Sequence, residues 1–353
     1  KLFEKKCRME NGLKHSEDIL LSDIRSIIYQ TKEMVSKVIT YNVTTMYWKI
    51  GNRINSEILD SQRAEYGKQI VATLSRQLII EYGRSYEEKN LRRMIQFASQ
   101  FSDIENVATL WRQLSWSHFK ILIPIKDELE RDFYTQMCRI ENWSVDTLRK
   151  KTNSLLFQRT AISKKPEELA KLEIQQLKKE DILTPDLVFR DPYLLDFLGL
   201  KDVYQEKDLE KAILREIEQF ILELGNGFAF LERQKRMQID NEDYYLDLLF
   251  YHRKLKRLVA VDLKIGKFEA SYKGQMELYL RWLEKYEKQE DEEAPIGLIL
   301  CAEGNKEQIE LLQLDATNIK VGEYITQFIP NELLKQKLHK AIQLSKSKID
   351  KCS

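Results

Sequence analysis

The sequence predicts an all-α N-terminal domain followed by an α/β C-terminal domain. Only 12 glycines and 6 prolines occur in 353 residues, which favours helices over a loop-rich all-β fold. Apolar residues follow helical spacing over the first 160 or so positions, and strand-like runs appear after Asp208. With 43% hydrophobic residues, a chain of this length can bury two cores. We therefore expect domains at 1–162 and 186–332, a linker at 163–185 and a basic tail at 333–353.

The N-terminal domain is predicted to consist of consecutive helices. Gly83 fits the left-handed position that ends a helix. Ser85 and Glu88 have the Ser-x-x-Glu spacing of a capping box, which opens the next helix. The expected helices cover about 16–58, 67–82, 85–100, 115–139 and 144–158.

The second and third of these helices, joined at Gly83, have the form of a helix-turn-helix. The third helix carries basic and amide side chains opposite its apolar side, namely Lys89, Arg92, Arg93 and Gln96. Such a face can contact phosphates and base edges. Basic helix pairs also occur in proteins that never bind DNA, so the N-terminal domain is expected either to bind DNA or to mediate assembly.

The C-terminal domain is predicted to have a mixed α/β order. The stretch 163–185 contains Pro166, the charged run 178–181 and the Thr184-Pro185 step, which are typical of a surface connection. Beyond it we expect a helix, three strands, a helix and further strands. Their ranges are about 208–224 (helix), 228–239, 243–252 and 257–265 (strands), 271–288 (helix), and 296–301 and 319–325 (strands).

Two of these strands form a predicted hairpin around the polar segment 253–256. A symmetric turn centred on Lys254-Leu255 pairs residues whose numbers sum to 509. Asp247 is therefore expected directly opposite Asp262. Opposed Cβ atoms in a strand pair are about 4.5–5.5 Å apart. Lys264 lies two residues beyond Asp262 and therefore on the same face.

Two carboxylates at this separation among apolar residues repel each other, and a hard divalent cation such as Mg²⁺ removes that cost. Lys264 could hold a water or stabilise developing negative charge. The pattern suits metal-assisted hydrolysis of a phosphodiester, with Asp247 and Asp262 as metal ligands. The alternative is an edge hairpin whose polar face is simply solvated.

The surroundings of this hairpin resemble the PD-(D/E)XK nuclease superfamily, and within it the YhcG family of bacterial proteins. The resemblance runs from about 186 to 330. Looser similarity occurs in the first half, whose family counterpart is a domain of unknown function. The residues that carry the resemblance are 191–193, 197–200, 222–230, 233–234, 247–253, 259–266, 274–280 and 297–301, with 66–68 and 90–94 in the first half.

The resemblance implies that Asp247 and Asp262 bind the metal and that Lys264 is the motif lysine. Gln275 and Tyr279 form a Gln-x-x-x-Tyr pair that is similar to an extra motif of some branches. They share a helix face and either point toward the site or dock the helix on the sheet.

The superfamily often adds an acid from the first core helix. Helical spacing and similarity to the resolvase branch favour Glu216, whereas the YhcG pattern favours Glu218. Both could equally be solvated residues of an amphipathic helix.

The predicted function is a metal-dependent deoxyribonuclease with Mg²⁺ as cofactor and Mn²⁺ as a substitute. Cutting both strands of a duplex requires two sites, so a homodimer or higher homo-oligomer is expected. The alternative is a protein that uses a nuclease fold to bind nucleic acid without cutting it.

Composition narrows the remaining classes of function. Four scattered cysteines and four histidines argue against a disulfide framework and a zinc centre, and suit a cytoplasmic location without a membrane partner. The formal net charge of +1 indicates no partner by itself. No phosphate-binding glycine loop is present.

Overall fold

The computed structural model describes residues 2–60, 64–102, 114–200, 204–314, 317–327 and 329–352. The chain divides into two compact units. One comprises Lys1–Arg131 with Met137–Leu148, and the other comprises Asp132–Gln136 with Arg149–Ser353. None of the helices in the described ranges combines the length and the apolar character needed to cross a bilayer.

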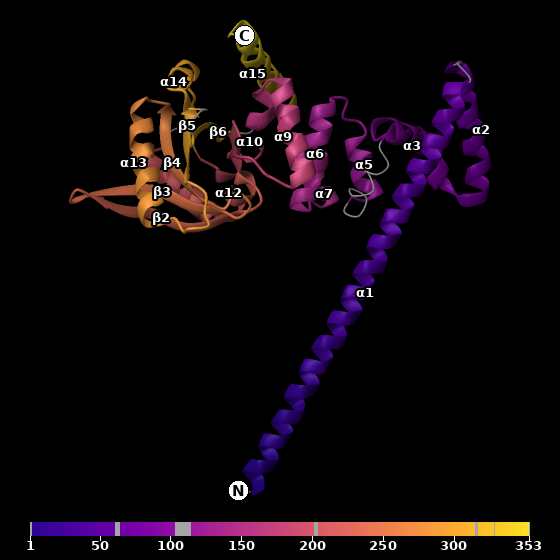
Figure 1. Cartoon of the computed structure of the whole chain (residues 1–353), viewed down its shortest axis with the longest axis horizontal. Helices are drawn as coiled ribbons and strands as arrows, with labels where there is room; N and C mark the ends of the chain where they lie inside the picture. The colour runs from indigo at the N-terminus through magenta and orange to yellow at the C-terminus, as the bar shows by residue number, and fades with distance from the viewer. Residues whose placement is uncertain are drawn as a thin grey trace. The chain divides into compact units, whose positions relative to one another are not determined.

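The first unit is helical, as predicted, and is built on one very long helix (Figure 1). Helix α1 begins much earlier than the expected start near residue 16. It packs against α3 at Gly51, where a Cβ atom would overlap the backbone carbonyl of Met94. The helices that begin in this unit are α1 (Leu2–Asp60), α2 (Ala64–Tyr82), α3 (Glu88–Gln100), α5 (Trp116–Leu122), α6 (Glu128–Glu141) and α7 (Val145–Asn153).

The connection between α2 and α3 differs in part from the prediction. Gly83 follows the end of α2 with φ of 87°, as expected of a residue that ends a helix. The predicted capping box is wrong, because Ser85 lies inside a short 3-10 turn, Arg84–Tyr86. Glu87 instead precedes α3, and its side chain makes no capping hydrogen bond. Ser85 and Tyr86, which were expected to begin the helix, belong to this turn, and α3 begins at Glu88.

Two of the helices predicted for the first half of the chain are each divided in two. The expected helix at 115–139 is interrupted between α5 and α6, where Pro124 cannot donate a helical hydrogen bond. Asp127 then caps α6 by accepting a hydrogen bond from the Glu130 backbone at 2.9 Å. The expected helix at 144–158 breaks at Leu155, whose φ of 53° is left-handed, and continues as α8 (Leu156–Arg159).

The stretch expected to be a surface connection contains helix α9 (Glu167–Glu180), followed by the short α10 (Pro185–Val188). Ala170, Ile174 and Leu177 are buried on one side of α9. Its charged residues, which suggested a linker, are the outer face of an amphipathic helix.

The second unit is built around a six-stranded mixed sheet with the order β1-β6-β5-β4-β3-β2. β3 pairs antiparallel with both β2 and β4, whereas the pairs β4–β5, β5–β6 and β6–β1 are parallel. The two-residue strand β1 was missed. The strands are β1 (Tyr193–Leu194), β2 (Phe228–Ile239), β3 (Glu242–His252), β4 (Arg257–Lys267), β5 (Ile296–Glu303) and β6 (Ile319–Ile325).

Helices accompany this sheet in nearly the predicted order. The expected helix at 208–224 is two helices, α11 and α12, with Glu216 at their junction. The expected basic tail is largely the helix α15, in which Leu334 and Leu338 are buried. The helices are α11 (Glu206–Arg215), α12 (Ile217–Leu224), α13 (Ser271–Tyr286), α14 (Lys306–Leu311) and α15 (Asn331–Cys352).

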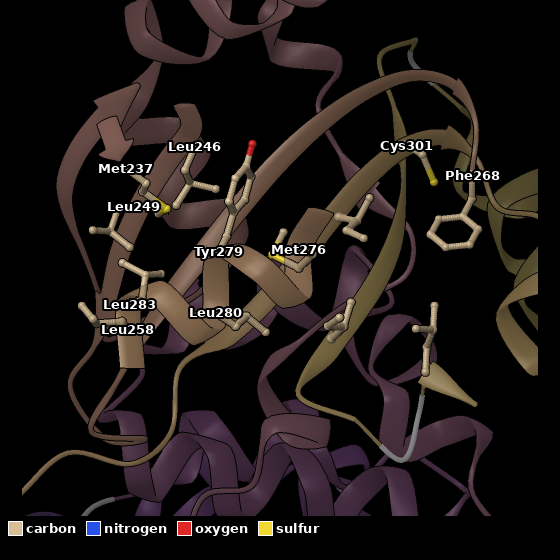
Figure 2. Packing of buried hydrophobic residues seen from close by; sticks show 14 residues of the cluster. Met237, Leu246, Leu249, Leu258, Phe268, Met276, Tyr279, Leu280, Leu283 and Cys301 are labelled. Atoms are coloured by element: carbon tan, nitrogen blue, oxygen red, sulfur yellow. The ribbon is translucent and has the colours of Figure 1, made fainter. Parts of the chain in front are cut away.

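A hydrophobic core between α13 and the sheet fixes the hairpin in place (Figure 2). Met276 and Leu283 of α13 pack with Leu249 of β3 and Leu258 of β4 in this cluster. Gly297 of β5 lies under Met276 so closely that a Cβ atom would collide with the methionine side chain. This packing therefore holds the central strands in place beside the part of β4 that carries Asp262 and Lys264.

Candidate active site

The hairpin register brings the two predicted metal ligands together. Pairs from Leu248 with Val261 to His252 with Arg257 all have the predicted alignment. Asp247 and Asp262 are the next residues along this register. The sequence prediction of the register is therefore confirmed.

Asp247 is held by hydrogen bonds at both carboxylate oxygens. Its Oδ2 accepts a hydrogen bond from the backbone nitrogen of Leu263 at 2.8 Å. Its Oδ1 accepts one from Nε2 of Gln234 at 3.0 Å. The first of these bonds crosses from β3 to β4, so the position of Asp247 is tied to the strand that carries Asp262.

Asp262 and Lys264 form a shielded ion pair on β4. Lys264 Nζ lies 2.9 Å from Asp262 Oδ2, and the two side chains are only 13% and 4% exposed. The ammonium also lies 5.2 Å from the ring centroid of Tyr272 on α13. These contacts leave the lysine with little freedom to move away from the carboxylates.

Burial makes both carboxylates hard to ionise. Burial raises the pKa of Asp247 to about 6, and the negative charge of Asp262 adds to the effect. Burial also raises the pKa of Asp262, against the opposing charge of Lys264. Burial alone would lower the pKa of Lys264, but Asp262 outweighs it and the pKa is raised. The lysine is therefore a cation, and the pair of aspartates carries unfavourable negative charge that a cation would relieve.

Two further acids from α11 face this cluster and were missed by the sequence prediction. Glu206 Oε1 accepts a hydrogen bond from the Ile265 backbone at 3.3 Å, and its charge acts on Asp262 and Lys264. Glu210 Oε2 lies 3.1 Å from Nε2 of Gln234, the same nitrogen that donates to Asp247. The predicted helix began at 208, which left Glu206 outside it. A signal was nevertheless present, because acids are favoured in the first turn of a helix.

The two glutamates predicted from the same segment lie elsewhere. Glu216 occupies the junction between α11 and α12, where its Oε1 is 3.3 Å from Nε of Arg215. Glu218 is exposed in the first turn of α12. Among the residues that the structure describes, neither glutamate forms a hydrogen bond or ion pair with Asp247, Asp262 or Lys264.

Gln275 and Tyr279 form a chain of hydrogen bonds that reaches β3. Gln275 Nε2 donates to Tyr279 Oη at 2.7 Å, and Tyr279 Oη donates to the Tyr245 carbonyl at 3.2 Å. Tyr279 is 1% exposed and belongs to the core cluster of Figure 2. The pair therefore docks α13 on the sheet two residues from Asp247.

The predicted DNA-binding residues share one face of α3. Lys89, Arg92 and Gln96 are exposed and Arg93 is half-buried. Arg92 Nη2 lies 2.5 Å from Glu88 Oε1, so part of its charge is already compensated. Leu91 and other apolar residues of the helix are buried on its opposite side.

The residues at the hairpin fit a hard divalent cation. Mg²⁺ is commonly held by one or two carboxylates together with water and substrate phosphate oxygens. Asp247 and Asp262 supply two carboxylates in a buried setting that disfavours their charge. In the described part of the chain, no group of three or more His, Cys, Asp or Glu side chains is arranged to hold a metal. Two carboxylates suit a cation that takes its remaining ligands from water and substrate.

Two solved structures show limited similarity to the chain. One is the crystal structure of a repair endonuclease from Pyrococcus abyssi, with 20% identity and a TM-score of 0.26, covering 37% of this chain and 50% of that one. The other is EndoMS in its apo form, with 17% identity and a TM-score of 0.25, covering 37% of this chain and 49% of that one. The matches span about half the length of these two proteins.

Similarity to known families covers both halves of the chain. Residues 186–339 match the model of the YhcG PDDEXK nuclease domain, and residues 23–159 match that of the DUF1016 N-terminal domain. Over 291 residues the chain is 36% identical to the Escherichia coli (strain K12) protein named "Putative nuclease YhcG", covering 74% of this chain and 77% of that protein. The chain therefore belongs to the YhcG family and carries its PDDEXK nuclease domain.

Proposed function

We propose that this protein is a metal-dependent deoxyribonuclease that hydrolyses DNA phosphodiester bonds at the β3–β4 hairpin. The observation that carries the proposal is the convergence of Asp247, Asp262 and Lys264, two carboxylates and one ammonium, within a shielded site. PDDEXK nucleases generally use divalent metal ions, and we propose Mg²⁺, with Mn²⁺ able to replace it.

Asp247 and Asp262 would hold the cation. When bound, it would lower the pKa of water and offset the charge of the scissile phosphate. Gln234 and the Leu263 amide orient Asp247, so its oxygens are already positioned before any cation arrives. Lys264 would place its positive charge beside the phosphate oxygen that gains negative charge. We propose that α11, the first core helix, contributes Glu206 to the site as an additional acid, rather than Glu216 or Glu218.

The exposed face of α3 is proposed to contact the DNA backbone. Lys89 and Arg93 supply positive charge and Gln96 supplies an amide, a combination that binds phosphates and can touch base edges. Replacing Lys89 and Arg93 together by alanine is expected to weaken DNA retention and reduce its dependence on salt. Arg53→Ala is the control, because Arg53 is an exposed arginine of α1 that pairs with Glu57.

The decisive experiment is cleavage of supercoiled plasmid with Mg²⁺ and, separately, Mn²⁺. Asp262→Asn and Lys264→Ala are each expected to lose at least a hundred-fold in rate, a magnitude typical of groups that stabilise transition-state charge. Lys267→Ala is the matched control, because Lys267 is also on β4 but its side chain is 69% exposed. A parent that shifts DNA on a gel without cutting it would favour the alternative of a non-cleaving DNA-binding protein. A Lys264→Ala variant as fast as the parent would contradict the proposed site.

A further inference from the structure

Helix α1 carries a large exposed apolar surface, which we call the α1 stripe. It consists of eight side chains that are between 38% and 65% exposed: Ile24, Ile27, Ile28, Met34, Val35, Val38, Ile39 and Met46. At 3.6 residues per turn they fall within a sector of about 140° on one side of the helix. Scattered exposed apolar residues are ordinary, but a contiguous group of this size marks a contact surface.

Apart from Met46 at its end, which lies 4.0 Å from the Tyr86 hydroxyl, the α1 stripe is separate from the face that α1 uses inside its own unit. That inner face contains Thr44, Trp48, Gly51 and Ile54, which are buried or closely approached by α3. Trp48 Nε1, for example, donates to the Phe101 carbonyl at 2.8 Å. These residues fall on the opposite side of the helical wheel. The fold of the unit therefore leaves the stripe available from Ile24 to Ile39.

The spacing along the stripe is that of a coiled coil. Residues 24, 28, 31, 35, 38, 42 and 45 follow each other at alternating intervals of four and three, and four of them are Ile or Val. The polar members are Thr31, Asn42 and, at the end of the seam, Thr45, whose hydroxyl is already buried inside the unit. The Thr31 hydroxyl already donates to the Ile27 carbonyl at 2.8 Å, so it can be covered without losing its hydrogen bond.

A second copy of the same helix fits this pattern better than an unrelated apolar partner. In a parallel pair without offset, every position meets itself, so Asn42 faces Asn42 and each β-branched residue faces its own kind. A single asparagine in such a seam fixes the register and orientation of the pair. An offset or reversed pair would instead bury polar residues against apolar ones.

The size of the stripe is also sufficient for a stable pair. Eight large side chains that are each about half exposed offer roughly the 800 Å² per partner that standard protein interfaces bury. The apolar residues on both flanks of the seam, Ile27, Met34 and Ile39, widen the contact beyond a minimal two-residue seam.

We propose that the α1 stripe is a homodimer interface, formed by two α1 helices packed in parallel and in register. The inference builds on the proposed function, since it names the surface that would join the two nuclease sites needed to cut a duplex. Its test measures mass and proximity without any cleavage reaction. A failed dimer and a failed nuclease can therefore be told apart.

The first experiment measures the mass of the full chain by sedimentation equilibrium at micromolar concentration. The parent is expected at about twice the 42.0 kDa of one chain. The double variant Ile28→Glu, Val35→Glu is expected to sediment as a monomer with unchanged circular dichroism, because both residues are exposed within the unit. The control variant Tyr29→Glu, Ser36→Glu adds the same charges to other exposed positions of α1 and should remain dimeric. A monomeric parent, or a stripe variant that keeps the parent's mass, would overturn the proposal.

The second experiment tests orientation and register by disulfide formation. Val35→Cys is placed in a background of Cys7→Ser and Cys352→Ser, while Cys138 and Cys301 are buried and remain. In a parallel pair without offset the two introduced thiols face each other, so mild oxidation should give a covalent dimer in high yield. Ser36→Cys in the same background points away from the seam and should give little. Equal yields from the two variants would overturn the proposed arrangement.

Discussion

A buried cluster of one carboxylate and two arginines offers a stringent test of the second unit's packing. Glu223 Oε1 lies 2.5 Å from Arg159 Nη1, and Glu223 Oε2 lies 3.0 Å from Arg190 Nη1. The arginine side chains are only 1% and 4% exposed. Burial alone would raise the pKa of Glu223, but Arg190 and Arg159 outweigh it and the pKa is lowered. The perturbation is Glu223→Gln, which keeps the shape of the side chain and removes its charge.

The expected loss follows from leaving two buried guanidinium groups without a counter-charge. At an effective dielectric constant of about 20, two unit charges about 4 Å apart interact by about 4 kcal/mol. Removing one partner of a buried ion pair destabilises proteins by about 3–5 kcal/mol. Glutamine can still accept the hydrogen bond that the Leu194 backbone donates to Glu223 Oε1 at 2.9 Å. We therefore expect Glu223→Gln to lower the free energy of unfolding by about 3–5 kcal/mol.

The assay is urea-induced unfolding, monitored by pulsed hydrogen exchange in peptides from β3 and β4. These strands belong to the same unit as Glu223, so the measurement does not depend on the first unit. Glu218→Gln is the control, because Glu218 is exposed on the same helix and its loss should change stability by less than about 0.5 kcal/mol. A Glu223→Gln variant within about 1 kcal/mol of the parent would refute the assignment of the cluster as a buried ion network.

Three further predictions concern stability. Burial lowers the pKa of His252 to about 4 from its usual value of about 6.5. The contribution of about 3 kcal/mol that neutral His252 makes to the free energy of unfolding is therefore present above pH 6.5 and lost as the pH falls toward 4. His252→Asn should flatten the pH dependence of the free energy of unfolding, measured in urea, and an unchanged slope would contradict this. Gly51→Ala should lower the melting temperature, because the methyl group collides with the Met94 carbonyl at a cost of about 1–3 kcal/mol; a higher melting temperature would argue against this close packing. Tyr279→Phe should cost about 1–2 kcal/mol by leaving the Tyr245 carbonyl without its donor, and should slow plasmid cleavage without abolishing it; complete inactivity with native stability would instead indicate direct participation in the reaction.

Much of the fold could be predicted because its signals are local. The positive φ of Gly83 and the β3–β4 register depend on residues adjacent in sequence, and both are as expected. Some errors are local, such as the capping box that a 3-10 turn at Arg84–Tyr86 replaces. Other errors concern features that depend on neighbours distant in the sequence. Strand β1 has two residues and exists only because β6 pairs with it, and α9 shows its buried side only once its packing is known.

The placement of the candidate residues on the hairpin could be predicted for the same reason. Asp247, Asp262 and Lys264 are linked by a short hairpin, so strand alternation was enough to place them on one face. Glu206 comes from a helix more than fifty positions earlier, and its approach to Ile265 depends on how α11 packs against β4. A helical wheel gives the side of a helix but not its axial position or its breaks, so it could not show that Glu206 approaches β4 or that Glu216 lies at a helix junction.

The hydrogen bond from the Leu263 amide to Asp247 has a consequence for how this domain can vary in length. The pairing register of β3 and β4 begins at the last pair before the turn at 253–256. The turn itself can therefore lengthen or shorten while Asp247 stays opposite Asp262. One residue inserted between the turn and either aspartate would move that aspartate to the opposite face of the sheet. A single-residue insertion within either arm of the hairpin would therefore separate the two carboxylates and destroy the site.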